Sequence, residues 1–188
     1  MKKEFAPGRL DVLAFARAGA RLPGRLPLAR LARLAAEAAE AAQAGAAAVE
    51  WSAEGACRAA AGHGDVPWLH LQARAQLPLV CQRCLEPVTV PLAVDRQFRF
   101  APDEDTAAAE DDTAEEDVLA LAHDFDLLAL LEDELLMELP AVPRHAVCPT
   151  AWNAPGPAAA QPDADAGSGR PHPFAALAGM KTGGQDKS

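Results

Sequence analysis

The sequence predicts an α+β protein, in which an antiparallel sheet is built on one long hairpin and flanked by two or more helices. A disordered acidic loop and a disordered C-terminal tail complete the predicted architecture. Apolar and polar side chains alternate with a period of two through residues 69–100, as in strands that bury one face. Before and after this region, leucines recur at helical spacing, so helices can cover the sheet.

The predicted hairpin has two arms with an interruption between them. Odd-numbered apolar residues run from Leu69 to Leu79 in the first arm. Even-numbered apolar residues run from Val88 to Phe100 in the second arm, where Arg96 is the exception. The interruption contains Cys81-Gln82-Arg83-Cys84, which places two thiols at the tip of the hairpin.

Residues 1–26 form a basic N-terminal arm with six Lys or Arg residues against two acids. Prolines and glycines punctuate this arm, so it is expected to be mostly irregular. It is either a solvated tail or a contact for RNA or the ribosome. A single α+β domain is expected to follow over residues 27–148.

Three features are predicted in the first part of this domain and in its acidic loop. Residues 27–44 predict a helix that begins at Pro27 and stops before a glycine. Residues 46–51 and 55–61 are expected to form two short strands around a turn. The acidic loop, residues 101–117, holds nine acids and no base, which is typical of a mobile segment.

A second helix is predicted over residues 126–139, where Asp124 and Asp126 are candidate caps for the first turn and a proline follows the last. Four leucines share one apolar face of this helix: Leu128, Leu131, Leu135 and Leu139. The consecutive acids Glu132, Asp133 and Glu134 are expected to lie on a solvated surface, because adjacent positions do not share a helix face.

The remaining residues predict two further segments. Residues 149–173 are rich in Pro, Ala, Gly and Asp, which indicates a disordered linker. Residues 174–188 begin with an apolar cluster and are expected to form a short C-terminal docking segment.

The acidic excess of the chain lies in its second part. Residues 1–100 hold 13 basic and nine acidic residues, whereas residues 101–188 hold four and 18. The net charge of −10 therefore does not exclude a nucleic-acid partner for the first part. No segment approaches the roughly 18 consecutive apolar residues that a membrane span needs. We expect a cytoplasmic protein whose four cysteines are thiols or metal ligands rather than disulfides.

The cysteine pair at the hairpin tip has the spacing of half a zinc knuckle. His145 and Cys148 follow the leucine-rich helix and could complete a site with Cys81 and Cys84, and Cys57 could replace His145. Structural zinc is one interpretation, and unliganded cysteines and a redox pair are the others. The redox interpretation conflicts with the strand that follows the motif, since a thioredoxin-type CxxC opens a helix.

No dinucleotide-binding, P-loop, serine hydrolase or metalloprotease motif occurs in the chain. We therefore expect a protein that is not an enzyme.

Three motifs, taken in order, resemble the YceD family of bacterial large ribosomal RNA subunit accumulation proteins, which has plastid relatives. They are CQRCL followed by EPV, then LLALLEDELLMELPAVPRH with Cys148 close by, then PFAALAGMK. The resemblance covers nearly the whole chain. It implies a small non-enzymatic factor for normal synthesis, processing or stability of 23S ribosomal RNA, and it supplies no catalytic residues. The alanine-rich helix after Pro27 and the linker at 149–173 depart from the family pattern.

The expected partner is ribosomal RNA or a precursor of the large subunit, with a ribosomal protein as a further candidate and no membrane or small-molecule substrate. The candidate phosphate contacts lie on or near the polar face or the tip of the hairpin: Arg74, Arg83, Arg96 and Arg99. Each is equally expected to be a solvated strand arginine. In the alternative function, the acidic loop imitates RNA, and the protein is an adaptor or chaperone for a basic ribosomal protein. A redox enzyme is the third class.

Overall fold

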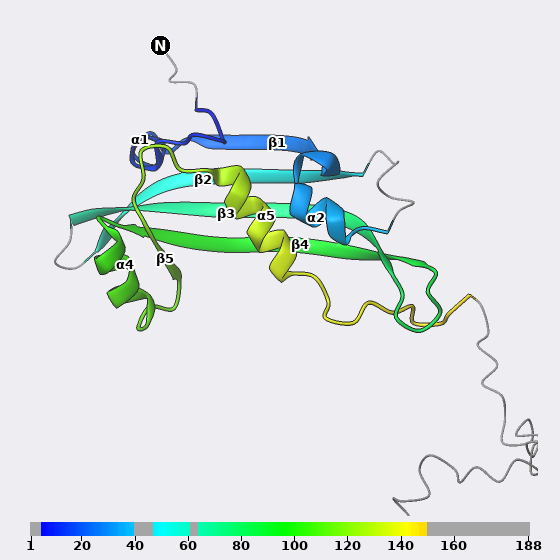
Figure 1. Ribbon diagram of the computed structural model, residues 1–188. Helices are drawn as coiled ribbons and strands as arrows, with labels where there is room; N and C mark the ends of the chain where they lie inside the picture. The colour runs from blue at the N-terminus through cyan, green and yellow to red at the C-terminus, as the bar shows by residue number, and fades with distance from the viewer. Residues whose placement is uncertain (1–4, 40–46, 61–63, 150–188) are drawn as a thin grey trace, which may run out of the picture. The chain divides into compact units, whose positions relative to one another are not determined.

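Five strands form one sheet, in the order β1-β2-β3-β4-β5 (Figure 1). The structure is a computed structural model that describes residues 5–39, 47–60 and 64–149. These residues belong to the first of two units of the chain, which ends at Pro149. The predicted linker and C-terminal docking segment lie outside the described residues, apart from Pro149.

Sheet order follows chain order. The strands are β1 (Arg21–Pro27), β2 (Ala48–Ala60), β3 (Gly64–Val80), β4 (Pro87–Ala101) and β5 (Asp117–Ala120). Neighbours pair antiparallel from β1 to β4, and β5 pairs in parallel with the end of β4. β1 and β5 are therefore the two opposite edges of the sheet.

The long hairpin predicted from the alternation is confirmed in β3 and β4. Leu69 pairs with Phe98 and Leu79 pairs with Val88, so the apolar residues of both arms share one face. Every odd-numbered residue of β3 from 69 to 79 is buried on that face. We call it the core face, and we call the opposite face, which carries His70 and Arg74, the outer face.

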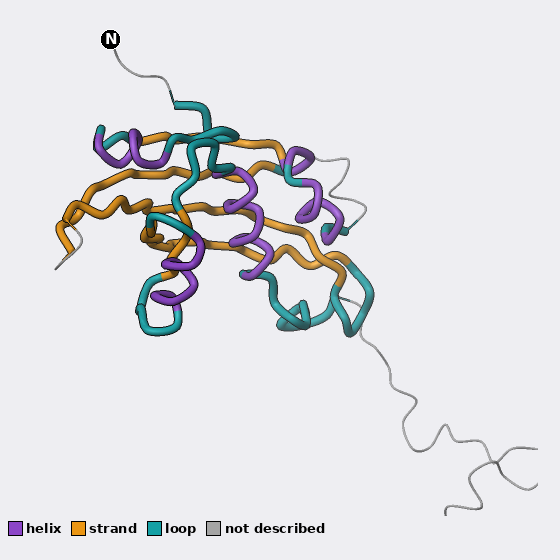
Figure 2. The backbone as a smooth tube through the Cα atoms, turned by 60° about the vertical axis from the view of Figure 1, so that its left-hand side comes forward, coloured by secondary structure: helices purple, strands orange, loops and turns teal. Residues whose placement is uncertain are grey.

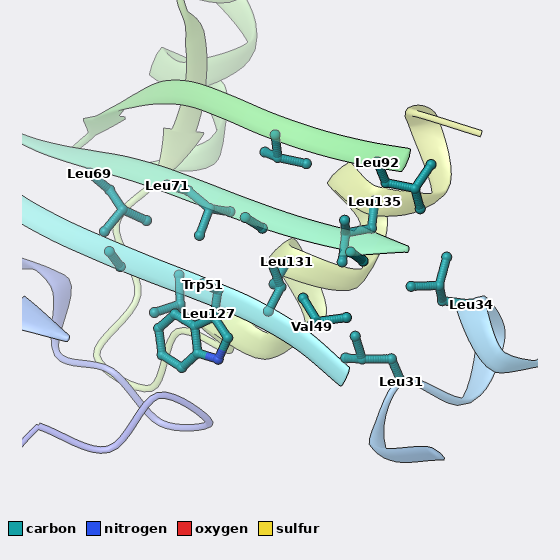
Figure 3. Close-up of a cluster of buried hydrophobic side chains, with 14 of the residues drawn as sticks. Leu31, Leu34, Val49, Trp51, Leu69, Leu71, Leu92, Leu127, Leu131 and Leu135 are labelled. Atoms are coloured by element: carbon teal, nitrogen blue, oxygen red, sulfur yellow. The ribbon is translucent and has the colours of Figure 1, made fainter. Parts of the chain in front are cut away.

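The core face is covered by α1 (Val12–Arg17), η1 (Leu28–Arg30), α2 (Ala32–Glu37) and α5 (Leu127–Met137). A second view shows these helices lying along one side of the strands (Figure 2). Three leucines of α5 are fully buried among the strand residues (Figure 3): Leu127, Leu131 and Leu135. Of the two candidate caps, Asp126 caps the helix, since its carboxylate accepts hydrogen bonds from the N–H groups of Leu128 and Ala129, each at 3.0 Å.

The helix α4 (Glu104–Asp111) packs on the outer face at the β5 edge. Val118 of β5 lies in a small cluster with Ala101 and with Ala107 of α4, whereas Leu119 packs against the main core. Adjacent strand residues point to opposite faces, so α4 and α5 lie on different sides of the sheet.

Residues 5–26 of the N-terminal arm are ordered, which corrects the prediction of a mostly irregular segment. Residues 12–17 form α1, and Asp11 caps it by accepting a hydrogen bond from the Ala14 N–H at 2.9 Å. A Cβ atom at Gly55 of β2 would lie 2.6 Å from Phe15 Cδ1, so this glycine lets α1 approach the sheet closely. The prediction of two short strands is wrong, because β2 runs through Gly55 without a turn.

The prediction for residues 27–44 is right in type and wrong in length. Helical structure occurs there only as η1 and α2, which ends at Glu37, and residues 40–44 lie outside the described residues. The alanine-rich turns after Leu34 offer little area to bury, so high helix propensity alone does not extend the helix to residue 39.

The predicted mobile acidic loop is also wrong, because residues 101–117 contain α4 and lead directly into β5. Asp103 caps α4 by accepting a hydrogen bond from the Thr106 N–H at 2.8 Å. Asp111 accepts a hydrogen bond from the Val118 N–H at 2.9 Å. Local capping and the small cluster around Val118 order a segment whose composition alone suggested mobility.

The three consecutive acids of α5 do not form the solvated surface that the sequence predicted. Glu134 is only 8% exposed and lies beside Arg96. Glu132 binds Arg33 of α2, and Asp133 remains largely exposed. The helix packs on the sheet and beside α2, so its buried arc is wider than the leucine stripe and includes both flanks.

Candidate metal centre

The six residues between β3 and β4 form a tight turn that brings two thiols together. The Cys81 N–H donates to the Glu86 carbonyl at 3.0 Å, and the Leu85 N–H donates to the Cys81 carbonyl at 2.9 Å. Leu85 has a φ of 63°, in the left-handed region that residues other than glycine rarely adopt. This residue turns the chain back into β4 directly after Cys84.

The chain after α5 returns to this turn. The Gln82 N–H donates to the Pro143 carbonyl at 2.9 Å. The His145 N–H donates to the Cys81 sulfur at 3.4 Å, and His145 Nδ1 lies 3.4 Å from the Cys84 sulfur. Two segments about 60 residues apart in the chain are thus held side by side at the hairpin tip.

Four side chains converge there, as the sequence predicted: Cys81, Cys84, His145 and Cys148. Their sulfur and ring-nitrogen atoms all lie within 4.8 Å of one another. Tetrahedral zinc, with Zn–S of about 2.3 Å and Zn–N of about 2.0 Å, holds such atoms about 3.5–3.8 Å apart. The cluster therefore has the donor atoms of a tetrahedral metal site, and a bound ion would draw them to this closer spacing.

The orientation of His145 fits a ligand. Its Nε2 atom lies 3.0 Å from the Pro87 carbonyl oxygen, which can only accept a hydrogen bond. The ring proton therefore belongs on Nε2, and Nδ1 presents its lone pair to the cysteines. Metal-bound histidines are commonly oriented in this way by a carbonyl behind the ring.

The two thiols of the turn differ in acidity. Burial raises the pKa of the Cys81 thiol, but the backbone N–H groups of Cys84, His145 and Arg83 together lower it to about 5. Burial raises the pKa of the Cys84 thiol, and the neighbouring Cys81 and Cys148 sulfurs raise it further. The centre thus has one sulfur that ionises readily and others that a bound cation would stabilise as thiolates.

Cys57 does not take part, so the alternative in which it replaces His145 is wrong. It lies in β2 opposite Pro67, 13 residues before the end of β3. At about 3.3 Å per strand residue, that position is roughly 40 Å from the hairpin tip. All four cysteines are free of disulfides.

Exposed apolar side chains lie in or near the chain segments that form the centre. In the described part of the chain, the large apolar residues that remain exposed all lie at the hairpin tip or after the middle of α5: Val80, Leu85, Met137, Val142 and Val147. The same two segments supply the four candidate ligands.

The four candidate arginines are not equivalent. Arg74 on the outer face and Arg83 at the tip are exposed, as predicted. Arg96 lies opposite Leu71, on the core face, where it pairs with Asp117 and approaches Glu134 at 3.7 Å. Its placement on the polar face is therefore wrong, and its even number already matched the apolar phase of β4.

Arg99 lies on the outer face beside α4, where its guanidinium pairs with Glu110 and, at 2.8 Å, with Glu116. Its side chain is only 16% exposed. Arg96 and Arg99 thus bind acids of the 101–117 segment, and both hold that segment against the sheet.

The fold and the centre together define a class of protein: an α+β domain with one five-stranded sheet and a candidate metal centre of three cysteines and one histidine. A family model described as large ribosomal RNA subunit accumulation protein YceD matches residues 69–181. The match spans more than half of the chain and includes all four candidate ligands, and the chain belongs to the YceD family.

No curated protein and no solved structure is significantly similar to the chain. Among the described residues, no helix has the length and apolar character needed to span a membrane.

Proposed function

We propose that the protein is a cytoplasmic, non-enzymatic factor for the synthesis, processing or stability of 23S ribosomal RNA during assembly of the large subunit. Family membership carries this proposal, because the matched model is named for the accumulation of large-subunit ribosomal RNA. The proposed partner is that RNA or a precursor particle, with a ribosomal protein as a second candidate.

We assign zinc to the centre at the hairpin tip. Three cysteine sulfurs and one imidazole form a ligand set that zinc takes in closed structural sites. Four protein ligands leave no position for a water molecule, so the role that fits is structural. A bound ion would hold the ligands as thiolates and add its binding free energy to folding. Its effect would be to join the residues after α5 to the hairpin.

The alternative adaptor function has less support. Much of the negative charge of residues 101–117 is engaged within the fold: Asp103, Glu110, Asp111, Glu116 and Asp117 all bind other groups of the domain. A surface that imitates RNA needs its carboxylates free for a partner.

Depletion of the protein from its host tests the proposed function. We expect a lower ratio of 23S to 16S ribosomal RNA and a smaller large-subunit peak in sedimentation profiles, both restored by the wild-type gene. An unchanged ratio would contradict the proposal.

Complementation with a variant at four exposed acids tests the alternative: Glu104→Gln, Asp105→Asn, Asp112→Asn and Glu115→Gln. None of these carboxylates forms an ion pair within the described residues. Full rescue is expected, whereas loss of rescue by a folded variant would favour the adaptor.

A further inference from the structure

The two edges of the sheet carry opposite charge. From Arg17 at the end of α1, through β1, to Arg30 at the end of η1, the chain holds four arginines and no acid. Residues 101–117, which lead from the end of β4 into β5 at the other edge, hold nine acids and no base. Because β1 and β5 are the outermost strands, the width of the sheet separates the four arginines from these nine acids.

Most arginines at the β1 edge are not held by acids of the domain, so their side chains can bind a partner. Arg17, Arg25 and Arg30 are exposed and form no ion pair within the described residues. Arg21 pairs with Glu54 at 3.0 Å, but both side chains are about half exposed or more. Ion pairs this exposed contribute little to stability. By contrast, Arg33, Arg96 and Arg99 each bind two acids of the domain.

The spacing of these side chains follows the edge. Arg21 and Arg25 pair with Glu54 and Glu50 on β2, and all four lie on the outer face. Four residues of a strand span about 13 Å. Arg17 precedes this pair at the end of α1, and Arg30 follows it at the end of η1. Both of these elements cover the core face, so the positive groups are spread along the β1 edge and are not confined to one face of the sheet. We call Arg17, Arg21, Arg25 and Arg30 the arginine row.

The edge is poorly suited to a partner that adds a strand. Pro23 and Pro27 lie in β1 and lack the N–H group that a pairing strand would need. Gly24 lies directly over the Trp51 ring, which a Cβ atom would approach to 2.4 Å. A partner at this edge must therefore bind the side chains, and an extended row of guanidinium groups suits a chain of phosphates.

We propose that the arginine row binds the phosphate backbone of RNA. The inference rests on the proposed function for the class of partner. It assigns the contact to β1 and the two arginines that flank it, not to the hairpin arginines Arg96 and Arg99. Such contacts supply affinity without reading sequence, and each one makes binding weaker as salt rises.

Binding of the full-length protein to a labelled transcript of 23S ribosomal RNA, titrated with KCl from low to physiological salt, tests this assignment. The test variant is Arg17→Gln/Arg25→Gln/Arg30→Gln. The control is Arg74→Gln/Arg83→Gln/Arg144→Gln, which removes equal charge from three other exposed arginines. Circular dichroism and thermal melting should match the wild type for both variants.

We expect the test variant to bind about tenfold more weakly or worse at low salt. We also expect the slope of log K against log salt to fall by about two, since each phosphate contact contributes about 0.7–0.9. The control should keep nearly the wild-type slope. Equal losses in both variants, or a wild-type protein that does not bind the transcript, would overturn the assignment.

The result also separates this inference from the proposed function. If depletion lowers 23S ribosomal RNA while the test variant binds the transcript as wild type does, the function stands and the arginine row is the wrong surface. If the test variant instead loses an acidic protein from RNase-treated particles and keeps RNA binding, the partner of the row is a protein and the inference is wrong.

Discussion

The Glu132 carboxylate of α5 accepts hydrogen bonds from the backbone N–H groups of Arg33, at 2.7 Å, and Leu34, at 3.2 Å. These groups belong to the first turn of α2, which follows Leu31, a residue whose side chain cannot cap a helix. The Arg33 Nε atom donates to the same carboxylate at 3.1 Å. Glu132 therefore caps a helix that lies 99 positions away from it in the chain.

We expect Glu132→Ala to lower the free energy of unfolding by about 0.5–2 kcal/mol, the usual loss for a helix cap. Glu132→Gln should lose less, because the amide oxygen still accepts from the α2 N–H groups. The control is Asp133→Ala, which removes only an exposed ion pair to Arg33 and should cost about 1 kcal/mol or less. Urea denaturation measures all three, and equal losses at both acids would contradict the capping role.

Leu131→Ala or Leu135→Ala should destabilise the protein by about 2–5 kcal/mol, because both side chains are fully buried under the sheet. Met137→Ala, on the same helix but with a side chain 73% exposed, should change stability by about 0.5 kcal/mol or less. Thermal or urea unfolding checks the difference. A large loss at Met137 would show that α5 presents a different face to the core.

Stability at Glu134 should depend on pH in a defined direction. Burial raises the pKa of this carboxyl, and Arg96 opposes part of the shift. The folded state therefore binds the proton of Glu134 more tightly than the unfolded state does. This tighter binding adds to the free energy of unfolding at low pH, and the added stability is lost as pH rises above the ordinary glutamate pKa of about 4.3. Relative to the wild type, Glu134→Gln should become more stable between about pH 4 and 7. Urea unfolding at several pH values tests this, and a constant difference would contradict it.

Protein purified without chelator should contain about one equivalent of zinc, measured by elemental analysis. Cys148→Ser should lose the metal and melt at a lower temperature, whereas Cys57→Ser, far from the centre, should retain both metal and stability. Chelation should also expose the Arg144 peptide bond to trypsin, since the centre holds that segment to the hairpin. Well under one equivalent of zinc, with four freely reactive thiols in the folded protein, would refute the assignment.

Leu85→Gly should leave stability unchanged or raise it by up to about 1 kcal/mol. A left-handed backbone is unfavourable for leucine and favourable for glycine, and this side chain is 74% exposed, so little burial is lost. Leu79→Gly, in the buried face of β3, is the control and should be strongly destabilising. Urea unfolding compares the two, and a comparable loss at Leu85 would mean that its side chain makes a contact essential to the turn.

Local periodicity in the sequence was sufficient to predict the hairpin, its core face and the helix over residues 126–139. A strand with one buried face and a helix with one apolar stripe each repeat within a few residues, so the pattern is visible without knowledge of the fold. The position of Cys81 and Cys84 at the tip follows from the same alternation. The three ordered motifs were likewise enough to indicate the YceD family.

Only the tertiary structure decided the rest. Arg96 lies beside Glu134 of α5, Glu132 caps α2, and His145 reaches Cys84 across 61 positions of the chain. Each contact joins two elements that are distant in sequence, and it exists because α5 packs on the core face and then directs the chain back to the hairpin tip. Spacing along the chain carries no information about such a contact, since the position of each partner depends on how whole elements pack.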